Sequence, residues 1–274
     1  MILLSGKDRV DETKQKILDY KEKNKSVLSS LSFYFFSDPN DKGSSVYIRS
    51  LKRILSEFSL PYEEGFYDAN RSEEENLKAV KNHADRNATM IFRPLPTQRE
   101  TEYLSLLNPD FDPDRLSKVN GGRLFFGDRD YLPATVKSIH AILKHYQIPL
   151  DGKKAVVLGR SVSLGLPCFL RLSKENRMVT QIHSHTNESM REERIKNADL
   201  IVLASGKRGL VNPSWLNNKQ TIIDCGFIKG GELGFAPDIY AYTPVPGGVG
   251  ALTPYYLVLN ARQEYRKQSE TMMK

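Results

Sequence analysis

The sequence contains few cysteines and no long apolar run. Its 274 residues include two cysteines, Cys168 and Cys225, and neither has a histidine or a second cysteine at metal-ligand spacing. No apolar run approaches the roughly 18 residues of a membrane span, and no N-terminal stretch has the basic, apolar and small-residue order of a signal peptide. We therefore expect both cysteines to be small buried hydrophobes in a cytoplasmic protein that has no metal site and no membrane association.

The chain also lacks a strong bias of charge. Its 40 basic and 33 acidic residues give a net charge of +7, and they are dispersed in short clusters. No basic stripe interleaved with aromatic residues is present, which argues against a nucleic-acid partner, whereas the sign of the charge suits an anionic small ligand. With 39% hydrophobic residues, the chain should bury a core in one large or two ordinary domains.

The N-terminal half mixes helical and strand patterns. Apolar residues at three-and-four spacing mark one helical face: Ile48, Leu51, Ile54, Leu55 and Phe58. Further helices are predicted over 11–30, 73–85 and 133–146, with strands at 31–36, near 66–67 and at 88–92. Residues 38–45 are predicted as a loop, and the Pro-, Asp- and Gly-rich residues 108–127 as a long ordered loop of a kind that is often functional.

The C-terminal half alternates apolar and polar segments. The apolar segments begin at about Ala155, Met178, Leu200 and Thr221, and polar, helix-compatible stretches separate them. This alternation predicts a doubly wound parallel sheet, so the fold class is α/β. Residues 242–253 are predicted as a Pro- and Gly-rich loop, and 254–267 as a closing helix.

Several segments in this half have the composition of a nucleotide site. Gly159 ends the first strand before a turn and a helix, an arrangement that suits a pyrophosphate, although any α/β protein can contain such a turn. His183, Ser184 and His185 follow the second strand where NAD enzymes often have a carboxylate. Together with Arg160, they favour NADP over NAD, unless they are ordinary surface residues.

The order of these motifs is similar to that of a known family. Gly159-Arg160-Ser161 with Gly165, then Ser205-Gly206-Lys207, Asp224-Cys225-Gly226 and above all PVPGGVG at residues 244–250 resemble the bifunctional methylenetetrahydrofolate dehydrogenase/methenyltetrahydrofolate cyclohydrolases. The resemblance implies a folate domain over 1–140, completed by a C-terminal helix at 254–274, and a Rossmann domain over 141–253 that binds NADP or possibly NAD. It also implies a cleft between these domains, tetrahydrofolate derivatives as ligands, and a homodimer.

The resemblance also assigns roles to single residues. Tyr47 and Asp114 would be catalytic and would bind the folate, with Asp114 holding the pterin nitrogens, and Gly247, Gly248 and Val249 would also bind substrate. The cofactor-binding residues would be Gly159, Arg160, Ser161, Gly165, Ser184, His185, Ser205, Gly206 and Phe227. An alternative for Asp110, Asp112 and Asp114 is that they are turn residues.

Two positions depart from the family pattern on the folate side. Leu51 stands where the family has a catalytic lysine, four residues after Tyr47, and Phe92 stands where it has a glutamine. On a helix, a residue five along lies about 140° from its start, so Lys52 should point away from the face of Tyr47. A third departure is Pro133-Ala134-Thr135, where the family has P-C-T. In addition, Arg115 replaces the glycine that follows the family's aspartate.

These departures lead to one hypothesis and three alternatives. The hypothesis is an enzyme that oxidises 5,10-methylenetetrahydrofolate to 5,10-methenyltetrahydrofolate, with its cyclohydrolase activity weakened or absent. One alternative keeps both activities and yields 10-formyltetrahydrofolate, with Lys118 or Lys52 replacing the lysine. The others are a non-catalytic nucleotide- or folate-binding protein and an unrelated Rossmann dehydrogenase.

Overall fold

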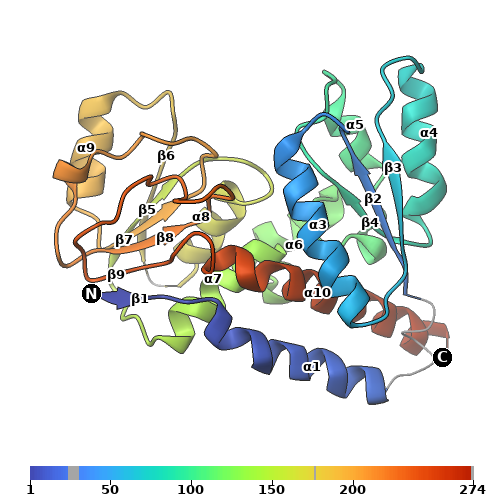
Figure 1. Cartoon of the computed structure of the whole chain (residues 1–274), viewed down its shortest axis with the longest axis horizontal. Helices are drawn as coiled ribbons and strands as arrows, with labels where there is room; N and C mark the ends of the chain where they lie inside the picture. Colours follow the sequence, from blue (N-terminus) through green and yellow to red (C-terminus); the bar gives the residue numbers. More distant parts are fainter. Residues whose placement is uncertain (24–30, 176, 273–274) are drawn as a thin grey trace. The chain divides into compact units, whose positions relative to one another are not determined.

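The strands of the described chain form two parallel sheets in two compact units (Figure 1). The structure is a computed structural model that describes residues 1–23, 31–175 and 177–272. Unit 1 comprises Met1–Asp11 and Leu124–Thr253, and unit 2 comprises Glu12–Arg123 and the chain from Pro254 onward. The predicted α/β class with parallel sheets is confirmed.

The units differ from the predicted domain limits in two places. Residues 1–11 belong to unit 1 because strand β1 (Ile2–Leu3) pairs with β9 (Ala241–Tyr242) in the sheet of that unit. Helix α7 (Ala134–His145) also belongs to unit 1, where Thr253 Oγ1 lies 3.3 Å from Ser138 Oγ. The boundary between the two compact units in this part of the chain falls after Arg123.

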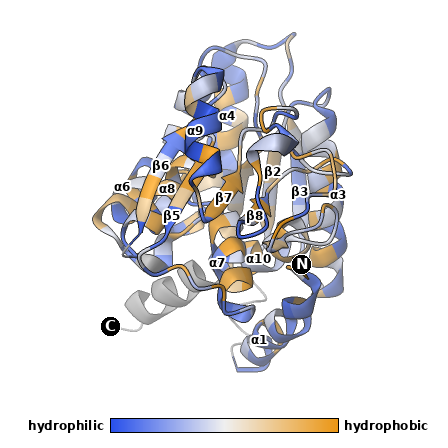
Figure 2. Ribbon diagram, turned by 90° about the vertical axis from the view of Figure 1, so that its left-hand side faces the viewer, coloured by the Kyte–Doolittle hydropathy of each residue, from blue (hydrophilic) through white to orange (hydrophobic). Residues whose placement is uncertain are grey.

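The sheet of unit 1 has the strand order β1-β9-β8-β7-β5-β6, and all of its pairings are parallel. Strand β7 is buried along its whole length, as expected for a central strand with both faces covered. One core cluster joins residues of the sheet to Ile195 of α9 and to Trp215. Figure 2 shows β5 and β7 in hydrophobic colours, whereas α9 is largely hydrophilic. The bounds are β5 Lys154–Leu158, α8 Gly165–Ser173, β6 Met178–Ile182, α9 Glu188–Lys196, β7 Leu200–Leu203 and β8 Thr221–Asp224.

The smaller sheet, in unit 2, has the order β3-β2-β4. Its central strand β2 is buried throughout, and alternate side chains point to opposite faces. Tyr34 and Phe36 pack with residues of α4 and α5, whereas Phe35 meets Phe92. The bounds are α1 Val10–Lys23, β2 Phe33–Ser37, α3 Lys42–Glu57, β3 Tyr62–Phe66, α4 Glu73–Ala84, β4 Ala88–Ile91, α5 Glu100–Ser105, α6 Lys118–Phe126 and α10 Val249–Met272.

Several predicted element limits were wrong. Helix α3 begins inside the predicted loop because Asp41 caps it, accepting from Gly43 N and Ser44 N. Helix α6 occupies the end of the predicted long loop, and α10 begins before Pro254, which lies inside the helix. Between β7 and β8 the described chain has the short 3-10 helix Pro213–Trp215 and no α-helix. Helix α1 ends at Lys23, and residues 24–30 of the predicted helix lie outside the described residues.

Candidate functional site

The turn after β5 is closely packed at both of its predicted glycines. Gly159 has φ +135°, and a Cβ there would overlap the backbone of Ala204 at the end of β7. A Cβ on Gly165, the first residue of α8, would overlap the backbone of Gly159. Only glycine allows this combination of left-handed backbone and close approach. The sequence therefore brings the start of α8 directly onto the strand end, as a phosphate-binding turn requires.

The start of α8 has the properties of an anion site. Its N-cap residue, Leu164, makes no capping hydrogen bond through its side chain, and Ser161 Oγ accepts a long one from Gly165 N at 3.4 Å. Arg160 and Ser161 are exposed beside it. The partly positive helix end and the guanidinium together suit the pyrophosphate of a nicotinamide nucleotide.

The histidine loop after β6 is held by local hydrogen bonds. His183 N donates to Thr186 Oγ1 at 3.1 Å, and His185 N donates to His183 Nδ1 at 3.2 Å. Ser184 and His185 are exposed, so both can meet a ligand from solvent. The loop follows β6, which pairs with β5, so it lies at the same carboxyl edge as the phosphate turn.

The loops after β7 and β8 bring three further predicted residues to this edge, namely Ser205, Gly206 and Phe227. Ser205 N and Gly206 N both donate to the carboxylate of Glu232, at 2.9 Å each. Asp224 is buried at the end of β8, and its carboxylate accepts from the amides of Gly226, Glu232 and Leu233. This arrangement leaves Phe227 at 60% exposed on the loop after β8.

The segment Pro244–Gly248 forms a tight turn against the N-terminal residues of the same unit. Gly6 N donates to Gly247 O at 2.9 Å, and Gly248 N donates to Pro244 O at 2.7 Å. Gly247 has φ +109°, and a Cβ on Gly248 would collide with Pro244 and Thr243. Val249 is buried as the first residue of α10. The three predicted substrate-binding residues are therefore consecutive positions of one close-packed turn.

On the folate side, Tyr47 and Phe92 lie together within unit 2. Their ring centroids are 5.9 Å apart in an edge-on arrangement, and Phe92 makes a second edge contact with Phe35 at 5.6 Å. Phe92 is buried, and Phe92 N donates to Phe36 O. An apolar ring thus occupies the position beside Tyr47 where the family resemblance predicts a glutamine.

Asp114 and Tyr47 influence one another electrostatically. Burial raises the pKa of Asp114 to about 7, the charge of Asp112 adds to this rise, and the charges of Arg93 and Arg115 oppose it. Burial and the negative charge of Asp114 together raise the pKa of the Tyr47 hydroxyl well above its ordinary value. At neutral pH the pair therefore offers a neutral phenol and a carboxyl group that is partly protonated.

The backbone around Asp114 keeps the left-handed turn that a glycine would allow. Arg115 has φ +61°, and its guanidinium donates to Asp112 O and Asn260 O at 3.4 Å each. The buried Asp112 carboxylate accepts from Leu116 N and Ser117 N at 3.1 and 2.7 Å. The turn interpretation therefore applies to Asp112.

Helix α3 separates Leu51 from Lys52 as its periodicity predicts. Leu51 is 1% exposed in the core, whereas Lys52 forms an ion pair with Glu64 of β3 and lies 5.6 Å from the centroid of the Tyr62 ring. Lys118, the other candidate replacement for the lysine, is exposed at the start of α6. Lys52 therefore does not lie on the face of α3 that Tyr47 and Leu51 share.

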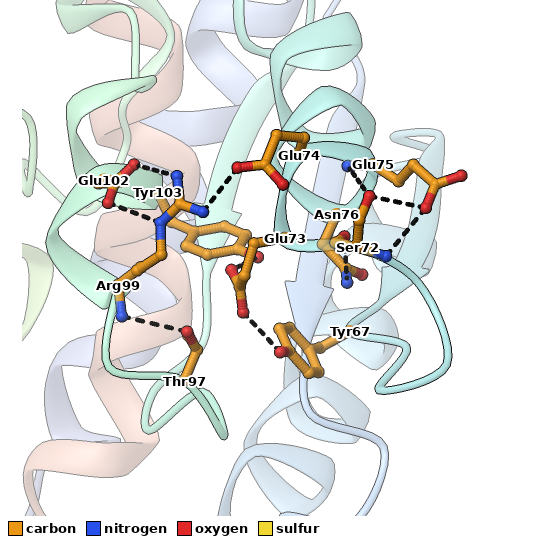
Figure 3. Close-up of polar contacts among 10 residues, drawn as sticks. All are labelled: Tyr67, Ser72, Glu73, Glu74, Glu75, Asn76, Thr97, Arg99, Glu102 and Tyr103. Atoms are coloured by element: carbon orange, nitrogen blue, oxygen red, sulfur yellow. Dashed lines mark hydrogen bonds and ion pairs between the residues drawn. The ribbon is translucent and has the colours of Figure 1, made fainter.

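A polar cluster anchors the loop that follows Phe92 (Figure 3). Glu73 accepts from Tyr67 and Tyr103 at 2.6 and 2.8 Å, and Arg99 joins Glu74 to Glu102. Burial alone would raise the pKa of Glu73, but hydrogen bonds from Tyr67, Thr97 and Tyr103 outweigh it and lower that pKa. These contacts tie the start of α4 to the chain from Thr97 to Tyr103, which follows Phe92 in the sequence.

Two cavities of unit 1 are lined by residues other than the predicted site residues. One, of about 340 Å³, lies between α7 and α8 and has His140, Arg171 and Glu175 at its rim. The other, of about 330 Å³, is lined by Asp224, Thr243 and Pro244 among others. Neither includes a predicted site residue. Among the described residues, no group of histidine, cysteine or acidic side chains could hold a metal ion, and no helix is long and apolar enough to cross a membrane.

Both cysteines have the properties of small apolar residues. Cys168 is buried and Cys225 is partly buried, and neither forms a disulfide. Burial raises the pKa of the Cys168 thiol to about 12 and that of Cys225 well above its ordinary value. Neither thiol is therefore primed as a nucleophile at neutral pH.

Unit 1 thus has a glycine turn after β5, a histidine loop after β6 and a PVPGG turn after β9, and this chain is similar to known proteins. Residues 133–269 match the family model described as tetrahydrofolate dehydrogenase/cyclohydrolase, NAD(P)-binding domain. The bifunctional protein FolD of Clostridium perfringens is 33% identical over 276 residues, covering 96% of this chain and 98% of that protein. This chain belongs to the tetrahydrofolate dehydrogenase/cyclohydrolase family.

Solved structures of family members share the fold over nearly the whole chain. The 5,10-methylenetetrahydrofolate dehydrogenase of the silkworm Bombyx mori has a TM-score of 0.86 and 25% identity, covering 98% of this chain and 99% of that one. The bifunctional FolD dehydrogenase/cyclohydrolase of Campylobacter jejuni has a TM-score of 0.84 with the same identity and coverage. The cofactor of the matched family domain is NAD or NADP.

Three residues that support the predicted site were not identified from the sequence. Glu232 and Arg208 hold the loops at the carboxyl edge of the larger sheet, and Arg93 contributes a positive charge near Asp114. Glu232 and Arg208 bind backbone groups far away in the chain, and such contacts leave no local pattern. For Arg93 a signal was present, since a cation stands where the family motif has leucine.

Proposed function

We propose that this family member is a methylenetetrahydrofolate dehydrogenase whose cyclohydrolase activity is weakened or absent. The observation that carries the proposal is the apolar pair Leu51 and Phe92 beside Tyr47, while the cofactor turn keeps its glycines. The reaction is the oxidation of 5,10-methylenetetrahydrofolate to the methenyl form, with a bound NADP or NAD supplying the hydride acceptor. Arg160 and the two histidines favour NADP.

The dehydrogenase step asks the protein mainly to bind and orient. Gly159, Gly165 and the start of α8 would hold the pyrophosphate, with Arg160 and Ser161 beside it. Asp114 would accept hydrogen bonds from the pterin amino group and ring nitrogen, which requires its ionised form. Tyr47 would contact the folate through its neutral hydroxyl, and Gly247, Gly248 and Val249 would line the substrate through the close-packed turn.

The cyclohydrolase step has a further requirement that this cluster does not meet. Water must lose a proton as it attacks the methenyl carbon, so a group that accepts and returns protons is needed there. Leu51 is buried and apolar, and Lys52 is paired with Glu64. Loss of a positioned acid/base group typically costs about 10²- to 10⁴-fold in the step that it serves.

An absorbance assay tests the proposal directly. The purified protein is given 5,10-methylenetetrahydrofolate with NADP or NAD, and reduced cofactor and methenyl product are followed together. We expect cofactor reduction with accumulation of the methenyl form. Hydrolysis of added methenyltetrahydrofolate well above the buffer rate would reject the loss of cyclohydrolase activity, and absence of cofactor reduction would reject the dehydrogenase.

The bifunctional alternative has one observation in its favour, which is the set of relatives named bifunctional FolD. If a repositioned Lys52 carried the hydrolysis, Lys52→Ala should abolish it while Leu51→Ala should not.

A homodimer stays a prediction of the family resemblance, and light scattering of the purified protein would test it.

A further inference from the structure

The loops after β7 and β8 are joined by a buried carboxylate. Glu232 is 7% exposed, and one of its oxygens accepts from Ser205 N at 2.9 Å and from Ser205 Oγ at 2.5 Å. Its other oxygen accepts from Gly206 N at 2.9 Å. Both oxygens are therefore used to fix the backbone of the loop after β7.

A second contact runs between the same loops in the opposite sense. Arg208, on the loop after β7, donates through Nε to Gly231 O at 2.7 Å and through Nη2 to Lys229 O. Asp224 adds support within the loop after β8, because it accepts from Glu232 N and Leu233 N. Each loop thus contributes one charged side chain that binds the backbone of the other.

The place of these loops in the sheet assigns them to one half of a dinucleotide. Strand β5 lies between β6 and β7, so the strand order reverses at β5, and a dinucleotide binds across such a point. The histidine loop after β6 lies on the side that we assign to the adenosine half. The loops after β7 and β8 lie on the opposite side, which leaves them for the nicotinamide half.

We propose that Glu232 and Arg208 are positioning residues that fasten the loops after β7 and β8 into one wall of the nicotinamide half of the cofactor site. This assignment rests on the proposed dehydrogenase function. Ser205, Gly206 and Phe227, which are predicted to touch the cofactor, belong to the fastened loops. Loss of the fastening should therefore affect the nicotinamide half and leave the adenosine half unchanged.

The experiment compares the whole cofactor with a fragment of it. Wild type, Glu232→Gln, Glu232→Ala and Arg208→Gln are titrated by calorimetry with NADP and with 2′,5′-ADP, which carries only the adenosine half, and are assayed for KM and kcat. If NAD is the cofactor used, AMP replaces 2′,5′-ADP. Glu193→Gln, an exposed glutamate of α9 that lies near Arg194, is the matched control.

We expect Glu232→Ala to weaken NADP binding about tenfold and to lower kcat, with 2′,5′-ADP binding unchanged within about twofold. Glu232→Gln should have a smaller effect, because it keeps an acceptor for Ser205 and places a donor against Gly206 N. Glu232→Gln and Arg208→Gln are also combined in a double variant. Its loss of NADP affinity should be smaller than the product of the two single losses, because both side chains hold the same loops.

Three outcomes would overturn the assignment. These are an equal loss of 2′,5′-ADP and NADP binding, unchanged NADP binding in Glu232→Ala and Arg208→Gln, and fully multiplicative effects in the double variant. If Glu232→Ala fails to fold, Glu232→Gln and Arg208→Gln still test the assignment, because the ratio of NADP affinity to 2′,5′-ADP affinity can be measured for them. A wild type that binds NADP and does not oxidise the folate would reject the proposed function, while the calorimetric comparison would still test the two residues.

Discussion

At the scale of single residues, three aspartates within five positions differ in what they contact. Asp112 is fully buried and binds the amides that precede α6. Asp114 lies near Tyr47 and the charges of Arg93 and Arg115. Asp110 is partly exposed, and its backbone N–H donates a hydrogen bond to the side chain of Asn108. The family resemblance singled out Asp114 among them, but the sequence did not show that Asp112 is a buried structural carboxylate, because burial depends on distant residues such as Asn260.

The first prediction concerns pH and Asp114. Because its pKa is raised to about 7, the carboxylate that we propose to bind the pterin donors should form as the pH rises through about 7. We expect the KM for 5,10-methylenetetrahydrofolate to fall between pH 6 and pH 8 in the wild type. In Asp114→Asn the KM should be raised about tenfold or more and should vary little with pH, since a charge-assisted hydrogen bond contributes about 1.5–3 kcal/mol. Steady-state kinetics at several pH values measure both effects.

Thermal unfolding gives an independent check with a fixed sign. A carboxyl group whose pKa is raised on folding stabilises the folded state most below the unfolded pKa of 3.8, and this contribution is lost as the pH rises through about 7. Asp114→Asn should therefore be more stable, relative to wild type, at pH 8 than at pH 4. Asp110→Asn is the control, and a pH dependence equal to that of Asp114→Asn would contradict the assignment.

The second prediction concerns Leu51 and Phe92. The double variant Leu51→Lys/Phe92→Gln should gain methenyltetrahydrofolate hydrolysis of at least about tenfold over wild type, because it places a proton-carrying group on the face of Tyr47. Its stability should fall, since Leu51 is 1% exposed and a lysine there is buried. Hydrolysis is followed by loss of methenyl absorbance, and Tm by calorimetry.

Lys52→Ala is the matched control for that variant. Lys52 is paired with Glu64 near the surface, so its loss should change stability by less than about 1 kcal/mol and leave both activities unchanged. If Leu51→Lys/Phe92→Gln gains no hydrolysis, the missing lysine and glutamine are not what limits this step.

At the scale of elements, the periodic segments were predictable and the irregular ones were not. The apolar face of α3 predicted that Leu51 is buried and that Lys52 points elsewhere, and the structure confirms both. Helix α6 was missed because Gly121 and Gly122 lie inside it and a Pro- and Asp-rich stretch precedes it. Strands β1 and β9 were missed because elements of two residues carry no period.

The third prediction separates two glycines that both have positive φ. Gly159→Ala should destabilise unit 1 and abolish cofactor binding, because its Cβ would overlap the Ala204 backbone. Gly206 has φ +70°, and a Cβ there would meet no atom within 4 Å, so Gly206→Ala should cost only the backbone strain, about 1–2 kcal/mol. Tm and NADP titration measure both. Equal losses in the two variants would contradict the packing argument.

At the scale of the whole molecule, unit 1 depends on residues from both ends of its sequence. Leu4 is fully buried, whereas its neighbour Leu3 is 49% exposed. Strand β1 adds parallel hydrogen bonds to β9, and Gly6 packs on the turn that contains Gly247 and Gly248. The domain limits could not be predicted from the sequence because this pairing joins segments that are separated by nearly the whole chain.

The fourth prediction follows from that pairing. Leu4→Ala should lower the free energy of unfolding by about 2–5 kcal/mol, as expected for a fully buried leucine. Leu3→Ala, at the exposed neighbouring position, should change it by less than about 1 kcal/mol. Urea unfolding followed by far-UV circular dichroism gives both values. Similar losses for the two variants would mean that β1 is not seated in the sheet as described.

The pairing of β1 with β9 also has a consequence for the nascent chain on the ribosome. Ile2 pairs with Ala241, and at about 5–20 residues per second the later strand is made roughly 10–50 s after the earlier one. Strands β2, β3 and β4 emerge within that interval and can pair with one another. Strand β1 is translated long before its partner and is therefore among the last of these strands to find its place, and its apolar residues Ile2 to Leu4 stay accessible to chaperones until then.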